Sequence, residues 1–156
     1  MTDTYRPLAT VTLGSSASSV TFSSIPATYR DLIVVVAGTT NATHNVGMRF
    51  NGDTGSNYFV VTMSGNGSTT NSFTLTDSFA LAGQLTTTQG NFVNQIMDYS
   101  ATDKHKTVLA RSNNPAAEVR ANISRWANTA ALTSIAISNA GTFSSGTTFN
   151  LYGIAS

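Results

Sequence analysis

Short runs of apolar residues alternate with polar turns along almost the whole chain. Within residues 118–124 the apolar side chains of Val119, Ala121 and Ile123 alternate with polar ones. Successive side chains of a β-strand point to opposite faces, so a period of two is typical of a strand with one face in a core. The pattern therefore predicts a protein built from β-strands.

Clusters of Gly, Asn, Ser and Asp divide these runs at short intervals, as in two-sheet folds. We predict an all-β fold, a jelly-roll-like β-sandwich of ten to eleven short strands. The sequence also permits a single helical turn, at either 78–82 or 128–132. The predicted strands cover residues 9–13, 18–22, 31–39, 46–50, 58–64, 72–75, 92–99, 107–112, 118–126, 134–139 and 147–154.

Two segments carry hairpin signals. Residues 14–17 form a small polar turn between the first two predicted strands. Asn51-Gly52 is a stronger signal, because both central residues of a type I′ turn need a positive φ. We therefore predict a hairpin that joins 46–50 to 58–64.

The chain length of 156 residues suits a single domain. We assign residues 9–156 to the sandwich and residues 1–8 to an N-terminal arm. Residues 31–39 are apolar at both strand parities, which predicts a strand that is covered on both faces.

The composition is rich in hydroxyl groups and poor in charge. Ser and Thr fill 44 of 156 positions, 10% of residues are charged, Glu118 is the only glutamate and there is no cysteine. Disulfides and thiolate metal sites are therefore excluded. The net charge is +1 and no apolar run approaches the roughly 20 residues of a membrane span. We expect neither nucleic acid nor membrane as a partner.

Few residues offer catalytic or metal-binding chemistry. Asp98 and Asp103 are the only closely spaced carboxylates, and a capped loop explains them. His44 and His105 lack the spacing of a zinc site. Residues 51–57 resemble a calcium loop but lack most of its carboxylates. We expect no enzymatic activity, no metal and no cofactor.

Trp126 lies in phase with the polar face of its predicted strand, so a straight strand turns it away from the core that Val119 and Ile123 would fill. Core or rim packing is one interpretation. A subunit contact is the other, because Trp and Arg are enriched at interfaces. The predicted interface residues are Trp126 with its neighbours Arg120 and Arg125, and Tyr5 and Arg6 in the N-terminal arm.

Several segments share their order with a known family. They are VTFSSIPATY (20–29), MRFNGDTGSNY (48–58), MDYS (97–100), KHKT (104–107), WANTAALTSI (126–135) and FNLYGI (149–154). The chain resembles a family of small β-rich virion structural proteins of tailed bacteriophages over nearly its whole length, with RFNGDTGSNY as the most specific part.

This resemblance implies a non-enzymatic particle protein that is made in the bacterial cytoplasm and located in the virion. The leading hypothesis is a capsid decoration or cement protein, a homo-oligomer and possibly a trimer, that binds major capsid or tail subunits. The alternative is a tail or fibre component with a receptor- or carbohydrate-binding role. Edge strands of a small sandwich need cover, which agrees with association.

Overall fold

The computed structural model describes residues 4–114 and 118–155, and these residues form twelve strands and no helix. The strands are β1 (Tyr5–Thr12), β2 (Ala17–Phe22), β3 (Asp31–Gly38), β4 (His44–Phe50), β5 (Tyr58–Gly65), β6 (Thr70–Asp77), β7 (Ala80–Leu85), β8 (Gly90–Met97), β9 (Lys106–Asn114), β10 (Glu118–Trp126), β11 (Ile135–Phe143) and β12 (Thr148–Ile154).

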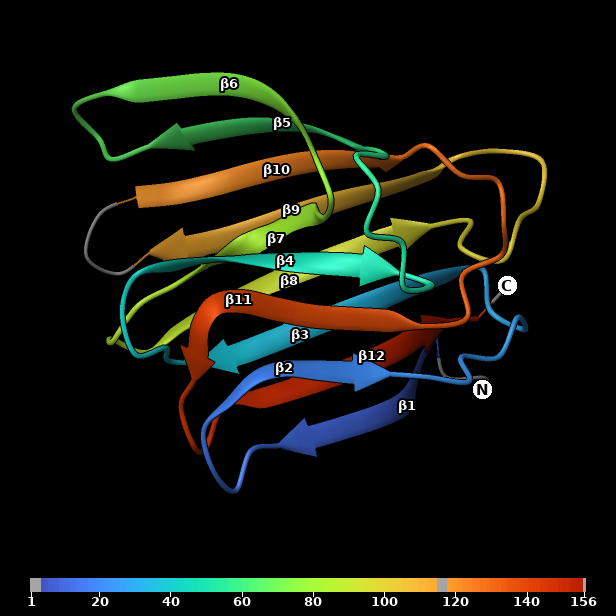
Figure 1. The fold of residues 1–156 in the computed structure, drawn as a ribbon, viewed down its shortest axis with the longest axis horizontal. Helices are drawn as coiled ribbons and strands as arrows, with labels where there is room; N and C mark the ends of the chain where they lie inside the picture. Colours follow the sequence, from blue (N-terminus) through green and yellow to red (C-terminus); the bar gives the residue numbers. More distant parts are fainter. Residues whose placement is uncertain (1–3, 115–117, 156) are drawn as a thin grey trace.

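The strands form two antiparallel sheets of unequal size. The eight-stranded sheet has the order β1-β12-β3-β8-β9-β10-β5-β6, and the four-stranded sheet has the order β2-β11-β4-β7. Figure 1 shows the small sheet lying across part of the large one, with β5 and β6 beyond its edge. The predicted all-β sandwich of jelly-roll type is confirmed.

The core fills the space between the sheets. Its largest fully buried side chains include Trp126, Tyr58, Phe50, Phe92, Phe143 and Phe149. In β3 the side chains of Leu32, Val34 and Val36 face the core and are fully buried, and Ile33 on the opposite face is 9% exposed. On the outward side Asp31 and Ile33 are buried and Val35 and Ala37 are half-buried, so the predicted cover on both faces holds for the first half of the strand.

One strand was not predicted. β7 occupies residues where the sequence allowed a helical turn at 78–82, and all its residues are buried. Its small residues let it lie close to the large sheet. A Cβ atom on Gly83 would stand 2.9 Å from the Phe92 side chain. The helical turn is therefore wrong, and the strands number twelve rather than ten or eleven.

Both predicted hairpins are also wrong. β1 pairs with β12 and β2 with β11, so the turn at 14–17 crosses from one sheet to the other. β4 pairs with β7 and β11, whereas β5 pairs with β6 and β10. The Asn51-Gly52 turn itself is present, with φ values of 52° and 70°. It reverses the chain between sheets instead of within one.

The N-terminal arm is shorter than predicted. Tyr5–Thr12 form β1, with Tyr5 opposite Ile154 and Arg6 opposite Gly153 of β12. The rest of the predicted arm, apart from Thr4, lies outside the described residues. The ladder to β12 places residues 5–8 of the predicted arm at the edge of the large sheet.

Candidate functional site

The orientation of β10 is the reverse of the predicted one. Asn122, Ser124 and Trp126 face the small sheet and are buried, whereas Val119 and Ile123 face outward with 65% and 41% exposure. The strand runs straight, with an unbroken register to β5 and β9. Alternation was predicted correctly, but the polar side is the inner one.

Trp126 is a core residue. Its side chain is 1% exposed, stacks against Tyr58 at a centroid distance of 6.4 Å and meets Phe50 edge-on at 5.6 Å. Its indole Nε1 donates a hydrogen bond of 2.7 Å to Asp53 Oδ2. The prediction that Trp126 faces outward to anchor an interface is therefore wrong, because the aromatic ring is buried between the sheets against Tyr58 and Phe50.

The loop that resembled a calcium site holds this tryptophan. Asp53 Oδ1 accepts from the Gly55 amide at 2.9 Å, and Asn57 Nδ2 donates to Asp53 Oδ2 at 2.9 Å. The hydrogen bonds from Trp126 and Asn57 lower the pKa of the Asp53 carboxyl. Asp53 is occupied in joining the β4–β5 connection to β10. The described residues contain no group of three or more His, Cys, Asp or Glu side chains that could hold a metal ion.

The inner face of the large sheet contains polar side chains without hydrogen-bond partners inside the described chain. Thr62, Asn122 and Asn94 lie in one cross-strand row, and Ser124 and Ser112 lie beside it. The row is buried, and β7 packs against these strands. Burying an unpaired polar group costs free energy. The interior is thus more polar than the pattern predicted.

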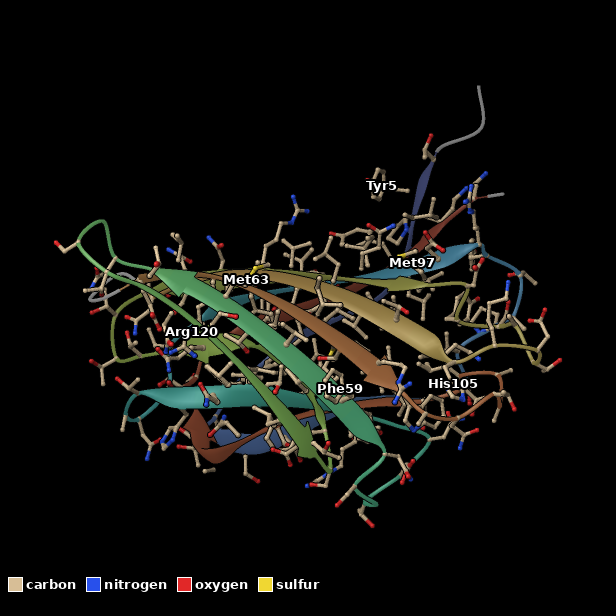
Figure 2. The ribbon with its side chains drawn as sticks, turned by 90° about the horizontal axis from the view of Figure 1, so that it is seen from above. Tyr5, Phe59, Met63, Met97, His105 and Arg120 are labelled. Carbon is tan, nitrogen blue, oxygen red and sulfur yellow. The ribbon has the colours of Figure 1, made fainter. Side chains whose placement is uncertain are left out.

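The outer face of the large sheet shows the opposite character. All of the exposed large apolar side chains in the described residues lie on it, except Phe73. We call this surface the apolar face and define it by Tyr5, Phe59, Met63, Met97, Leu109, Val119 and Ile123. Figure 2 shows Tyr5, Met97 and Met63 in the upper part of the view, and Phe59, at the other end of β5 from Met63, lower than Arg120. Soluble monomers rarely expose large contiguous apolar patches.

Two arginines are embedded in the apolar face. Arg111 lies between Ala121 and Val93, and Arg125 lies between Phe59 and Thr107 in the cross-strand rows. Both are exposed, and neither has an ion pair or hydrogen bond within the described part of the chain. The carboxylate of Asp31 is also on this side, but it is 7% exposed and accepts from Gln95 Nε2 and the Asp98 amide. The exposed charge of the face is positive.

The remaining predicted interface residues divide between the two sides. Tyr5, at 58% exposure, and Arg125 belong to the apolar face, and Arg6 is exposed on β1. Arg120 turns inward, where it pairs with Glu118 and donates to Asn45 Oδ1 of β4 at 3.1 Å. It joins the two sheets. The sequence does hold a signal for the apolar face. If the bulky Trp126 is placed in the core, the alternation of the strand turns Val119 and Ile123 outward.

A second surface is a groove of about 430 Å³ on the outer side of the small sheet. It lies over β4 and β11 beside the segment that precedes β7. The lining residues are Thr43, His44, Asn45, Gly47, Arg49, Phe79, Ser138, Asn139 and Ala140. Apart from His44, which was considered for a zinc site, sequence reasoning missed them.

The only closely spaced carboxylates form a surface ion-pair cluster. Lys104 Nζ is 3.6 Å from Asp98 Oδ2 and 3.9 Å from Asp103 Oδ1. All three side chains are half-exposed or more. This arrangement is that of a capped loop, as the sequence suggested. Within the described residues, no helix is long and apolar enough to cross a membrane.

Comparisons with known proteins find no relatives in sequence and only distant similarity to solved structures. No protein-family model and no curated protein matches the chain. Among solved structures it is similar to the galectin LEC-6 of Caenorhabditis elegans, with 9% identity, a TM-score of 0.40 and coverage of 94% of this chain and 96% of that one. CG-16, a homodimeric agglutinin from chicken liver, shares 11% identity with a TM-score of 0.38 and coverage of 84% and 98%.

The alginate lyase Aly36B shares 10% identity with a TM-score of 0.31, over 92% of this chain and 78% of that chain. At such low identities and TM-scores, none of these three structures carries an argument about function.

Proposed function

We propose that the chain is a non-enzymatic structural protein of a bacteriophage virion, a capsid decoration or cement protein that docks on the particle through the apolar face. One observation carries the proposal: nearly all of the exposed large apolar side chains of the described residues gather on the outer side of the large sheet. A surface that buries these side chains on assembly explains why they are exposed on one side of the isolated chain. The sequence resemblance to virion proteins supports the same role.

The charge of the apolar face favours a different virion protein, such as a major capsid or tail subunit, as its occupant. Two copies of this chain meeting face to face would bring Arg111 and Arg125 of both together, and the described residues of the face include no exposed carboxylate to neutralise them. Like charges brought together at an interface oppose binding. We therefore propose an occupant that offers apolar side chains with carboxylates opposite these two arginines.

Incorporation into virions tests the proposal. Ile123→Glu places a carboxylate in the centre of the apolar face on an exposed strand position, so we expect loss of incorporation with little loss of stability. Thr21→Glu is the matched control, because Thr21 is an exposed β-branched strand residue on the other sheet. Incorporation of Ile123→Glu at the wild-type level would contradict the docking face.

Copy number in purified particles separates the two locations. Hundreds of copies per virion indicate capsid decoration, and a few to tens indicate the tail, the neck or a fibre. A chain absent from purified particles would contradict the virion role itself.

A second candidate function is receptor or carbohydrate binding by a tail or fibre component. The observation that favours it is the groove on the small sheet, which combines an aromatic ring with amide, hydroxyl and guanidinium groups. Binding of the isolated protein to host cells would support this candidate, and binding sites of this size commonly hold small ligands.

A further inference from the structure

The groove on the small sheet has a defined floor. Ser138 of β11 and Gly47 of β4 are directly opposite each other in the ladder, and both line the groove. Gly47 lies under the Phe79 ring, and Ser138 has only a short side chain, so a ligand can approach the sheet closely at Ser138. Figure 1 shows β11 and β4 side by side in the sheet that faces the viewer.

An aromatic ring forms one wall. A Cβ atom on Gly47 would lie 2.5 Å from Cδ2 of Phe79, so the Phe79 ring rests directly on the glycine. Arg49 holds the segment that carries this ring, because its Nε donates to the Ser78 carbonyl at 3.1 Å and its Nη2 donates to Ser78 Oγ at 3.2 Å. The ring and the guanidinium group therefore have fixed places along the groove.

The polar groups of the groove are mostly donors. Asn45 Oδ1 already accepts from Gln84 Nε2 and Arg120 Nη1, each at 3.1 Å, which leaves the amide nitrogen of Asn45 for a ligand. Asn139 Oδ1 accepts from the Gly141 amide at 2.7 Å, so this acceptor is also occupied; its Nδ2 is buried and does not face a ligand. The Arg49 guanidinium group, which also lines the groove, adds a positive donor.

Carboxylates are missing from this lining. The groove residues, all of them in the described part of the chain, include no Asp or Glu. Outside the lining, the Asp77 carboxylate accepts from Ser78, which in turn accepts from Arg49. Donors with a guanidinium group, in a lining without an acid, favour a ligand that is rich in acceptors and negatively charged. The Phe79 ring adds an apolar surface on which a pyranose ring can lie. The volume of about 430 Å³ is in the range of small-ligand sites.

From these features we infer that the groove binds an acidic saccharide, with a uronate-type carboxylate at Arg49 and a sugar ring against Phe79. The inference rests on the second candidate function, receptor or carbohydrate binding, and names its ligand class and site. It does not involve the apolar face, which lies on the other sheet.

Calorimetric titration of the full chain with tetragalacturonate tests the inference, with a neutral galactose tetramer as the matched ligand. We expect the acidic tetramer to bind with a Kd of about 1 mM or tighter, more weakly at high salt, and the neutral tetramer to bind at least about tenfold more weakly. Equal binding of both tetramers, or no binding of the acidic one, would overturn the inference.

Two substitutions locate the site. Asn45→Asp keeps the shape and the acceptor oxygens but adds a negative charge, so we expect about tenfold or greater loss of affinity with an unchanged melting temperature. Asn71→Asp adds the same charge at an exposed position of β6 and should bind normally. Ser138→Tyr fills the floor and should abolish binding. Normal affinity in both Asn45→Asp and Ser138→Tyr would overturn the assignment of the groove.

The same variants separate this inference from the functions it stands beside. Host-cell binding that survives Ser138→Tyr would keep the receptor-binding function and overturn the groove as its site. Virion incorporation depends on the apolar face, so its loss or retention in Ile123→Glu is measured independently of saccharide binding.

Discussion

Asp53 is the side chain that connects the most specific sequence segment of this protein to its core. It accepts from Trp126 Nε1 at 2.7 Å and from the Asn57 side chain and the Gly55 amide. Tyr58 stacks on Trp126 and accepts from the Phe50 amide through its hydroxyl at 3.0 Å. The segment that resembles a virion family thus links the two sheets through the contacts of Asp53 and Tyr58 with Trp126.

Asp53→Asn tests this link through the pH dependence of the free energy of unfolding. The hydrogen bond from Trp126, followed by that from Asn57, lowers the pKa of Asp53 below its ordinary 3.8 in the folded state. A lowered folded-state pKa stabilises the protein above the unfolded-state value, and this stabilisation is lost as pH falls through the folded-state value. We expect Asp53→Asn to lower the free energy of unfolding by about 1–2 kcal/mol at pH 7 and by much less near pH 2.

Urea unfolding at the two pH values measures this difference. Asp103→Asn is the control, because Asp103 has a side chain that is 77% exposed and only a 3.9 Å ion pair with Lys104. A loss of stability in Asp53→Asn that is the same at both pH values would show that the charge of Asp53 does not stabilise the folded protein.

Asn122 offers a second test, because it is buried without a partner. Its amide oxygen and nitrogen are both unpaired within the described chain, and the residue is fully buried. Asn122→Leu removes the cost of burying these groups while keeping the same number and branching of side-chain heavy atoms, so we expect the free energy of unfolding to rise by about 1–2 kcal/mol. Asn71→Leu on exposed β6 should change it little. Denaturant unfolding of both variants decides, and a destabilised Asn122→Leu would contradict the account of the polar interior.

β10 shows what periodicity can and cannot specify. Alternation identifies which side chains share a face, and it placed Val119 and Ile123 together correctly. It does not say which face is inside, because that depends on what the other sheet brings to each side. The largest side chain, Trp126, fills the space between the sheets and takes Asn122 inward with it.

The connections between strands show a similar limit. Local φ requirements predicted the turn at Asn51-Gly52, but the pairing partners of β4 and β5 come from strands far along the chain. β7 escaped prediction because its residues are buried at both parities and include small ones that do not alternate. The all-β sandwich could be predicted from the sequence, whereas both candidate binding surfaces depend on packing between distant strands.

The turn that was predicted correctly gives a further test. Gly52 has a φ of 70°, and a Cβ atom at this position would meet no other atom within 4 Å, so any cost of a side chain there comes from the backbone alone. Gly52→Val should lower the free energy of unfolding by about 1–2 kcal/mol. Gly14→Val is matched, because Gly14 has equal space and no positive φ. Equal melting temperatures for the two variants would contradict the role of the left-handed turn.

The two sheets are offset, and this offset leaves part of the molecule uncovered. β5 and β6 extend beyond the edge of the small sheet, and β6 is the outermost strand of the large one (Figure 1). Most residues of β6 are exposed, and Asp77 at its end is its only charged residue. Free strand edges without charged residues are open to pairing with other chains.

Phe73 makes this edge the place where we expect self-association. It is paired with Thr62, on the core-facing side of the sheet, yet it is 39% exposed because no strand of the small sheet covers it. It is also the one exposed large apolar side chain of the described residues outside the apolar face. Three β6 edges that meet around a symmetry axis would bury three Phe73 rings together, which is how we propose that the homo-oligomer, a trimer, forms.

Light scattering on the purified chain tests this assembly. At micromolar concentration we expect a mass of three times 16.3 kDa for the wild type. Phe73→Glu should shift the mass to that of a single chain, because three carboxylates at the axis repel one another and lose the apolar contact. Ile123→Glu, which alters the apolar face, should leave the mass unchanged, since we propose that this face contacts a different protein. A wild-type mass of 16.3 kDa, or a trimer that persists in Phe73→Glu, would contradict association through β6.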